Sequence, residues 1–310
     1  MFMLPSVCLP AMRNCRVMDT NVTLIWPQTN RGSIAIVILT LICFCSFLYS
    51  IIVILHIILT IPHLKDNTRY LLFAHMLVND TVYLVTGLLL FLGAWYLIYL
   101  PVPFCYFTYT VATSTYRVTP YNLAVMSLER YVAISFPLRH AEFCTVRNAT
   151  IAIVVIWTVA LIPNLADFIT ISSSFGKLRP MVCSQGALSV TPEQNTIRTL
   201  TFTISFTLVA LIILFTYFKV LLVARSIGSG KSSAIKASKT VMLHAFQLLL
   251  CMTSLLSSIT ERYPFNYISL LTVSTFLLFT CLPRFLSPLI YGLRDEVLSK
   301  HFIRIHTVKK

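Results

Sequence analysis

Seven long stretches of this chain are apolar enough to cross a lipid bilayer, and this limits its fold more than any other feature. A membrane-spanning helix needs about 20 mostly apolar residues. Because the bilayer core holds no water, each segment must satisfy its own backbone hydrogen bonds, as an α-helix does. The sequence therefore predicts an all-α membrane protein, a seven-transmembrane helix bundle with spans at 33–61, 70–92, 104–131, 149–171, 199–224, 240–260 and 267–291.

The composition supports a membrane protein. Hydrophobic residues make up 57% of the 310 residues and charged residues only 11%, whereas about a quarter of a soluble domain is charged. These proportions exclude a soluble enzyme and a disordered chain. The nine cysteines are too few for a secreted module held together by disulfides.

The positive charges indicate which way the bundle faces, because cytoplasmic loops are enriched in Lys and Arg. With the N-terminus outside, fourteen of the 24 Lys and Arg residues fall on the cytoplasmic side, seven on the outer side and three within spans. This distribution predicts an outer N-terminus and an inner C-terminus. The net charge of +14 then reflects topology and contact with anionic membrane lipid. It does not indicate a nucleic-acid partner.

The segments outside the bundle are predicted to be short. Residues 1–32 form an extracellular tail in which Asn21 begins a glycosylation sequon. Residues 33–291 form the bundle, and residues 292–310 form the cytoplasmic end. Apolar side chains are mixed with basic ones over 294–305, which predicts a short amphipathic eighth helix on the inner membrane surface. A frayed tail is the alternative.

A Glu–Arg–Tyr triplet, Glu129-Arg130-Tyr131, stands at the inner end of the third predicted span, within MSLERYVAI and shortly before PLRH. A Glu and an Arg at the membrane edge can pair, which lowers the cost of keeping both near hydrocarbon. If the Arg can exchange the Glu for a partner on another helix, the pair is a latch with two states. From the triplet alone, an ion pair that only anchors the helix remains the alternative.

Three more motifs stand in other spans. The second span contains AHMLVNDT at 74–81, the sixth begins with KASKT at 236–240, and the seventh ends in SPLIYGLRDE at 287–296. Together with the string in span three, they resemble the rhodopsin-like (class A) G-protein-coupled receptors, and more narrowly the odorant receptors of fish. The resemblance extends from about residue 35 to about residue 300.

The resemblance implies a receptor and not an enzyme. Such a receptor binds a small-molecule odorant in the outer half of the bundle and activates a heterotrimeric G protein, of the cAMP-raising olfactory type, at the cytoplasmic face. It implies a place in the plasma membrane of olfactory cilia, with an arrestin and a receptor kinase as further partners. No cofactor is expected, and His56, His75 and His244 lie on different spans without the paired spacing of a metal site. A rhodopsin-like receptor for a non-odorant ligand and a transporter or channel remain alternatives.

The same resemblance assigns residues to an activation switch and to a polar network. Arg130, once released, meets the G protein, often with a Tyr of span five as its partner. In the polar network Asp80 belongs to a pocket that can hold a sodium ion, although span one lacks the Asn that the family usually has there. The assigned switch residues are Glu129, Arg130, Tyr131, Tyr217, Lys239, His244, Pro288 and Tyr291, and the network residues are Asp80, Thr119 and Ser287.

Two cysteines are candidates for a bridge at the outer face. Cys105 precedes Arg130 by 25 residues, which places it about 37 Å away along a helix, at the outer end of span three. Cys183 is the only Cys between residues 172 and 198, in the long outer loop. The outer face is oxidising, so a bridge is chemically allowed there. The resemblance implies that these two cysteines form the disulfide of the family.

The ligand is expected between spans three, five, six and seven. Helix packing explains the candidate residues equally well, and Ala112 stands where aminergic receptors carry an Asp. The charges Arg117 and Arg284 each need a carboxylate, a carbonyl or water inside the membrane. Either both make structural pairs with Asp80, Asp167 or a carbonyl, or Arg117 meets an anionic odorant. The candidates for ligand binding are Ala112, Thr113, Tyr116, Arg117, Met252, Leu255, Ser258 and Thr275.

Overall fold

The computed structural model describes residues 31–96, 98–172, 180–183, 188 and 192–226, and also residues 242, 246, 249, 282 and 284. Five long helices account for most of them, and they confirm the first five predicted spans. The sixth and seventh spans lie outside the described residues apart from the isolated positions, as do the eighth helix and the tail with Asn21. The long helices are α1 (Arg31–Thr60), α3 (Thr68–Trp95), α4 (Val102–Ser135), α6 (Val146–Ser172) and α7 (Pro192–Ser226).

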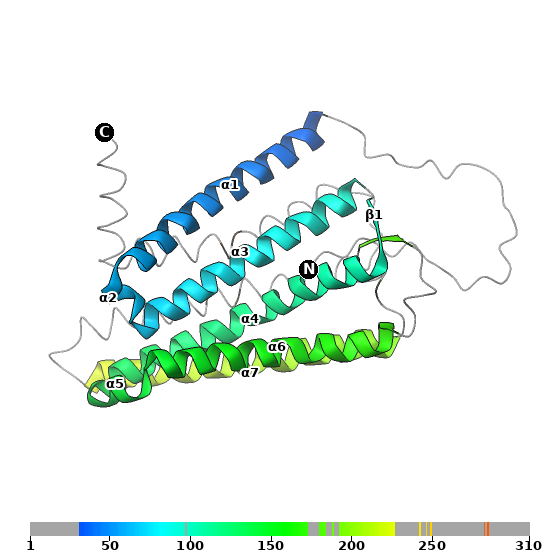
Figure 1. Ribbon diagram of the computed structural model, residues 1–310. Coiled ribbons are helices and arrows are strands. Elements are labelled where there is room, and N and C mark those ends of the chain that lie inside the picture. Colours follow the sequence, from blue (N-terminus) through cyan, green and yellow to red (C-terminus); the bar gives the residue numbers. More distant parts are fainter. Residues whose placement is uncertain are drawn as a thin grey trace, which may run out of the picture.

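The short elements gather at the two ends of these helices (Figure 1). At one end lie α2 (Pro62–Lys65), the 3-10 helix η1 (Pro137–Arg139) and α5 (His140–Phe143). Thr68 Oγ1 donates a hydrogen bond to the Cys144 carbonyl there, at 2.7 Å, which joins the two connections.

At the other end, strand β1 (Tyr99–Leu100) pairs antiparallel with β2 (Met181–Val182). Tyr99 lies opposite Val182 in this pairing. The long outer loop is therefore attached to the connection between α3 and α4.

Helix α4 lies at the centre of the described helices and packs against α3, α6 and α7. Every residue from 112 to 120 is buried, so protein surrounds this part of α4 on all sides. By length and composition, α1, α3, α6 and α7 each qualify as a membrane span, whereas α4 is more polar than these four. A helix shielded from lipid by its neighbours can carry polar side chains toward them.

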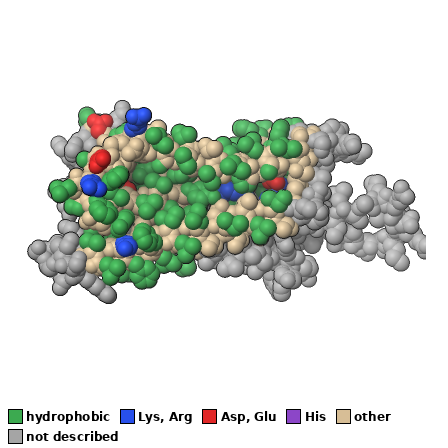
Figure 2. Space-filling model, turned by 90° about the horizontal axis from the view of Figure 1, so that it is seen from below, with side chains coloured by type: hydrophobic (Ala, Val, Ile, Leu, Met, Phe, Trp, Pro, Cys, Tyr) green, Lys and Arg blue, Asp and Glu red, His purple; other side chains and the backbone are tan. Residues whose placement is uncertain are grey.

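The outer helices expose apolar side chains. On α7 the exposed apolar residues recur every three or four positions and therefore share one face. Figure 2 shows hydrophobic side chains over the middle of the face seen from below, with charged side chains concentrated at the end that carries α5. This apolar middle faces lipid in a membrane-spanning bundle. The exposed residues of α7 include Leu200, Ile204, Leu208, Leu211, Leu214, Phe218 and Leu222.

Candidate functional site

A disulfide between Cys105 and Cys183 fixes the outer end of the bundle and confirms the predicted bridge. The Cα atoms of the two cysteines are 5.4 Å apart, and both residues are buried. Cys105 lies in the first turn of α4 and Cys183 directly follows β2. The bridge and the strand pair therefore hold the outer loop over the start of α4, and the Glu129 end of α4 is the cytoplasmic end.

A buried ion pair lies deep in the bundle, between Asp80 of α3 and Arg284. Arg284 Nη1 lies 2.6 Å from Asp80 Oδ1, although the two residues are 204 positions apart. The Thr119 hydroxyl of α4 donates to the same carboxylate oxygen at 2.9 Å. The Asn79 amide in turn donates to the Thr119 hydroxyl at 3.0 Å. The structure thus brings together Asp80 and Thr119, whereas Ser287 lies outside the described residues.

Aromatic rings surround the Arg284 guanidinium. Its Cζ lies 3.6 Å from the centre of the Tyr83 ring and 5.9 Å from that of Tyr116. Cation–π attraction is strengthened where water is excluded, and Arg284 is only 2% exposed. Of the partners expected for this arginine, the structure shows Asp80. Arg284 supplies beside Asp80 the positive charge that a bound cation would otherwise supply.

The Glu129–Arg130 pair lies at the inner end of α4. Arg130 Nε is 3.6 Å from Glu129 Oε2, and the other carboxylate oxygen is 3.3 Å from His140 Nε2. Arg130 Nη2 is buried and has no hydrogen-bond partner among the described residues. Glu129 is therefore shared between Arg130 and His140, and the end of the Arg130 side chain remains available for another contact.

Two neighbours of this pair come from the inner connection between α4 and α6. His140, the last residue of the PLRH string, begins α5. The pKa of the Cys144 thiol is raised by burial and also by the negative charge of Glu129. The thiol of Cys144 is therefore neutral at physiological pH and poorly nucleophilic.

Tyr131 and Tyr217 connect this end of α4 with α7. The Tyr131 ring packs edge-on against Phe215 of α7, with ring centres 6.0 Å apart. Tyr217 is partly buried and packs against the main core. The other predicted switch residues, Lys239, His244, Pro288 and Tyr291, lie outside the described residues.

Asn164 of α6 is the centre of a hydrogen-bond network with α4. Its side-chain nitrogen donates to Ser114 Oγ at 2.6 Å, and its side-chain oxygen accepts from Thr113 Oγ1 at 3.1 Å. The Tyr106 hydroxyl donates to the Asn164 backbone carbonyl at 2.6 Å. The network fixes the rotation of α4 relative to α6. It thereby fixes the direction in which the neighbouring side chains of α4 point.

Arg117 lies beside this network without a carboxylate within ion-pair distance among the described residues. Its Nη1 donates to the Ala160 carbonyl at 3.4 Å and to Asn164 Oδ1 at 3.3 Å. Its Cζ lies 4.4 Å from the ring centre of Phe202 on α7. These contacts confirm a carbonyl partner for Arg117, but both oxygens belong to neutral groups.

The predicted ligand-binding residues of span three are all buried. Ala112 is one of these buried residues of α4. Tyr116 is another, and its ring packs against those of Tyr83, Phe202 and Phe206. Met252, Leu255, Ser258 and Thr275 lie outside the described residues. Ligand binding by these residues stays a prediction.

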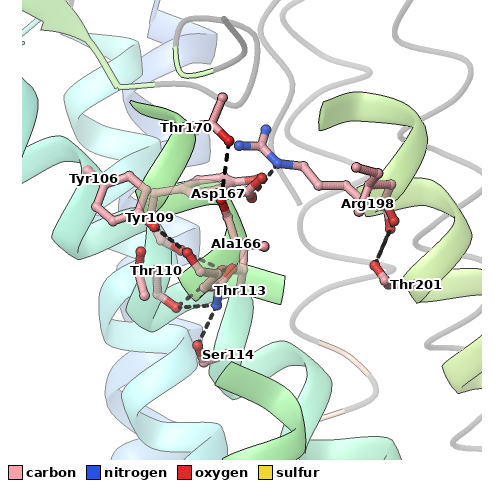
Figure 3. Close-up of polar contacts among 12 residues, drawn as sticks. Tyr106, Tyr109, Thr110, Thr113, Ser114, Ala166, Asp167, Thr170, Arg198 and Thr201 are labelled. Atoms are coloured by element: carbon pink, nitrogen blue, oxygen red, sulfur yellow. Dashed lines mark hydrogen bonds and ion pairs between the residues drawn. The ribbon is translucent and has the colours of Figure 1, made fainter. Parts of the chain in front are cut away.

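A second buried ion pair, between Asp167 of α6 and Arg198 of α7, was missed by the sequence analysis. Arg198 Nε lies 2.6 Å from Asp167 Oδ2, and Figure 3 shows the Arg198 side chain reaching across from α7 to α6. Asp167 was one of three alternative partners for the mid-span arginines, and it pairs with Arg198 instead. Arg198 was placed in the outer loop because the predicted span began at residue 199. Pro192 at the start of α7 was the available signal, since Pro is favoured in a first helical turn.

A half-buried histidine that joins three helices also escaped the sequence analysis. Trp157 Nε1 donates to His75 Nε2 at 3.0 Å, and His75 Nδ1 lies 3.4 Å from Asn122 Oδ1. Because the indole can only donate, His75 Nε2 accepts, and the ring proton is on Nδ1. This neutral histidine joins α3, α4 and α6.

Comparison with known proteins gives the family. A family model described as 7 transmembrane receptor (rhodopsin family) matches residues 50–291. The chain is 32% identical to Odorant receptor 131-2 of Danio rerio over 241 residues, 74% of this chain and 73% of that one. It is 32% identical to Galanin receptor type 2 of Mus musculus over 44% of this chain and 38% of that one. It is 26% identical to the Alpha-1A adrenergic receptor of Canis lupus familiaris over 57% and 58%. The chain therefore belongs to the rhodopsin family of seven-transmembrane receptors.

Proposed function

We propose that this receptor detects odorants: a small odorant binds in the outer half of the bundle, and a heterotrimeric G protein that raises cAMP binds at the cytoplasmic face. The family consists of receptors and not enzymes. The extent of the match to a fish odorant receptor carries the odorant part of the proposal. That relative aligns with 74% of this chain, whereas the galanin receptor aligns with 44% and the adrenergic receptor with 57%.

The contacts of Arg130 support its proposed part in the switch. Its 3.6 Å contact with Glu129 is long for an ion pair, and Glu129 has a second partner in His140. A conformational change can offer Arg130 a better partner on another helix or on the G protein. Such a change breaks only the weak contact between Arg130 and Glu129. We assign G-protein coupling to Glu129, Arg130, Tyr131 and Tyr217 here, and to the predicted residues of spans six and seven.

The Asp80–Arg284 pair couples the proposed movement of span seven to the centre of the bundle. Arg284 lies one turn before Pro288, where span seven is expected to bend. A ligand shifts the receptor only by binding its two states with different affinity. A ligand that moves span seven must move Arg284 with it, and the strain passes to Asp80 and Thr119, which are fixed on α3 and α4.

The proposed topology follows from the disulfide and from the charge distribution. The receptor is a multi-pass protein of the plasma membrane, and we propose the cilia of olfactory neurons as its location. Residues 1–32 with a glycan on Asn21 lie outside, and residues 292–310 with the amphipathic helix lie inside. An arrestin and a receptor kinase bind the activated cytoplasmic face in this proposal.

A cAMP assay in transfected cells tests the proposal. Cells that express the receptor are expected to raise cAMP in a concentration-dependent way with at least one member of a broad odorant panel. Arg130→Ala, compared at equal surface expression, is expected to reduce that response to the level of untransfected cells, because the switch has lost its cation. Ion flux or solute uptake without any nucleotide response would contradict the proposal and favour the transporter or channel alternative.

A further inference from the structure

Two buried arginines and one carboxylate lie in the outer half of the bundle, and only one of the arginines, Arg198, pairs with that carboxylate. Arg117 of α4 and Arg198 of α7 are each 3% exposed, and Asp167 of α6 is 5% exposed. Among the side chains that the structure describes in this part of α4, α6 and α7, these three are the charged ones. Asp80 and Arg284 deeper in the bundle balance one another, whereas this outer cluster retains one positive charge.

The unused edge of Arg198 has the geometry of an anion clamp. Asp167 contacts Arg198 through Nε alone, at 2.6 Å. Both terminal nitrogens of Arg198, Nη1 and Nη2, are buried and have no hydrogen-bond partner among the described residues. This terminal edge carries two parallel N–H bonds, which match the two oxygens of a carboxylate. In Figure 3 it points away from α7, beside Thr170 of α6.

Arg117 of α4 provides a second guanidinium whose N–H groups are not all hydrogen-bonded. It lies one helical turn deeper in the bundle than Arg198. It lies over Phe202, and Phe202 follows Arg198 by one turn of that helix. Its Nε is buried and has no partner among the described residues, and its two acceptors are neutral oxygens at 3.3 and 3.4 Å. Arg198 in turn lies 5.6 Å from the ring centre of Tyr109. Each of the two cations therefore lies against an aromatic ring, Arg117 against Phe202 and Arg198 against Tyr109.

Leaving such a charge uncompensated inside a membrane is costly, and buried charges are normally paired. Neutral carbonyl and amide oxygens solvate Arg117 only partly. An additional anion would satisfy the terminal nitrogens of Arg198 and restore a balance of two positive and two negative charges. Asp167 would continue to orient Arg198 while that anion is bound.

We propose that Arg198 and Arg117 form the anion-recognising part of the odorant site, and that the preferred ligand is a small amphiphile with a carboxylate. Its carboxylate binds the terminal edge of Arg198, and its apolar part lies against Tyr109, Tyr116 and Phe202. The inference deepens the proposed function and rests on it for the statement that this chain binds a small odorant. It adds Arg198, which lies outside the set predicted from the sequence.

The direct test is ligand binding to purified receptor in phosphatidylcholine nanodiscs, which contain no anionic lipid. Octanoate and octanol serve as probes of equal chain length, and the shift of the melting temperature with concentration gives their affinities. Octanoate is expected to bind the unmodified receptor about tenfold or more tightly than octanol, because a hydrogen-bonded charge pair is lost with the alcohol. Equal affinity for the two probes would overturn the proposal.

The variants separate recognition from folding. Asp167→Asn/Arg198→Gln removes both charges of the pair, so it leaves no isolated charge behind and is expected to fold and to lose the preference for octanoate. Asp167→Asn alone is expected to strengthen octanoate binding, because the competing carboxylate is gone. Thr201→Val is the matched control, since among the described residues its hydroxyl bonds only to carbonyls of its own helix. It is expected to bind both probes like the unmodified receptor. An octanoate preference that survives in Asp167→Asn/Arg198→Gln would refute the role of Arg198.

Two further comparisons distinguish a failure of the anion site from a failure of the proposed function. Octanoate binding without any cAMP response would leave the anion site standing and contradict the proposed function. A cAMP response to neutral odorants, together with equal binding of octanoate and octanol, would leave the proposed function standing and refute the anion site. Stabilisation by phosphatidylserine in place of octanoate would assign the anion to a lipid headgroup and overturn the proposal of a soluble ligand.

Discussion

Asp80→Leu is expected to lower the free energy of unfolding by about 3–5 kcal/mol, because it removes the carboxylate that balances a buried guanidinium. Arg284 is 2% exposed and Asp80 is fully buried, so water cannot take the place of the missing partner. Thr119 would also lose its acceptor, which breaks the chain of hydrogen bonds that runs from Asn79 through the Thr119 hydroxyl to this carboxylate. The measurement is equilibrium denaturation of purified receptor in mixed micelles, together with the fraction of receptor at the cell surface.

The double variant Asp80→Leu/Arg284→Leu is the decisive companion. Replacing a whole buried ion pair by apolar side chains is often neutral, so the double variant is expected to recover most of the lost stability. Asp66→Leu, at an exposed turn between α2 and α3, is the matched control and is expected to change stability by less than about 0.5 kcal/mol. A double variant as unstable as Asp80→Leu would show that the charge pair is not the origin of the loss.

Removing the outer disulfide is expected to cost about 2–5 kcal/mol, because the bridge closes a long loop in the unfolded chain. The two cysteines are 78 residues apart, and the bridge also keeps β2 beside β1. Cys105→Ser and Cys183→Ser are each expected to remove most of the receptor from the cell surface. The measurement is surface labelling together with the melting temperature of purified receptor.

Cysteine controls make that result specific. Cys144→Ser removes a free thiol at the opposite end of the bundle and is expected to leave surface expression unchanged. Cys105→Ser/Cys183→Ser is expected to behave like either single variant, because the first substitution already breaks the bridge. Clearly additive losses would contradict a common disulfide as the cause.

Local sequence patterns predicted the elements whose signal is local. Hydrophobic length predicted the first five spans within a few residues at most ends, because a span must match the bilayer thickness. The start of α7 is the exception. The apolar stretch ends at Arg198, whereas the helix continues outward to Pro192, because a helix can carry a charge once that charge is paired with Asp167 of α6.

Contacts between helices were harder to predict than the helices themselves. The choice between Asp80 and Asp167 as the partner of Arg284 depends on the depth and rotation of three helices, which no single segment encodes. The hydrogen bond from Trp157 to His75 has the same origin, since both side chains fit a packing role in their own helices. Asp80 and Thr119 were assigned together through the family resemblance, and the Cys105–Cys183 bridge came from the same source.

In the proposed function, an outer ligand controls a movable cation, Arg130, at the inner end of α4. Nucleotide exchange on a purified heterotrimeric G protein, stimulated by receptor in nanodiscs, measures this most directly. Glu129→Gln is expected to raise the basal exchange rate, because Arg130 loses its local partner, while Arg130→Ala abolishes stimulation by an active odorant. Glu142→Gln, at an exposed site on α5, is expected to behave like the unmodified receptor. Full odorant-stimulated exchange by Arg130→Ala would contradict the account.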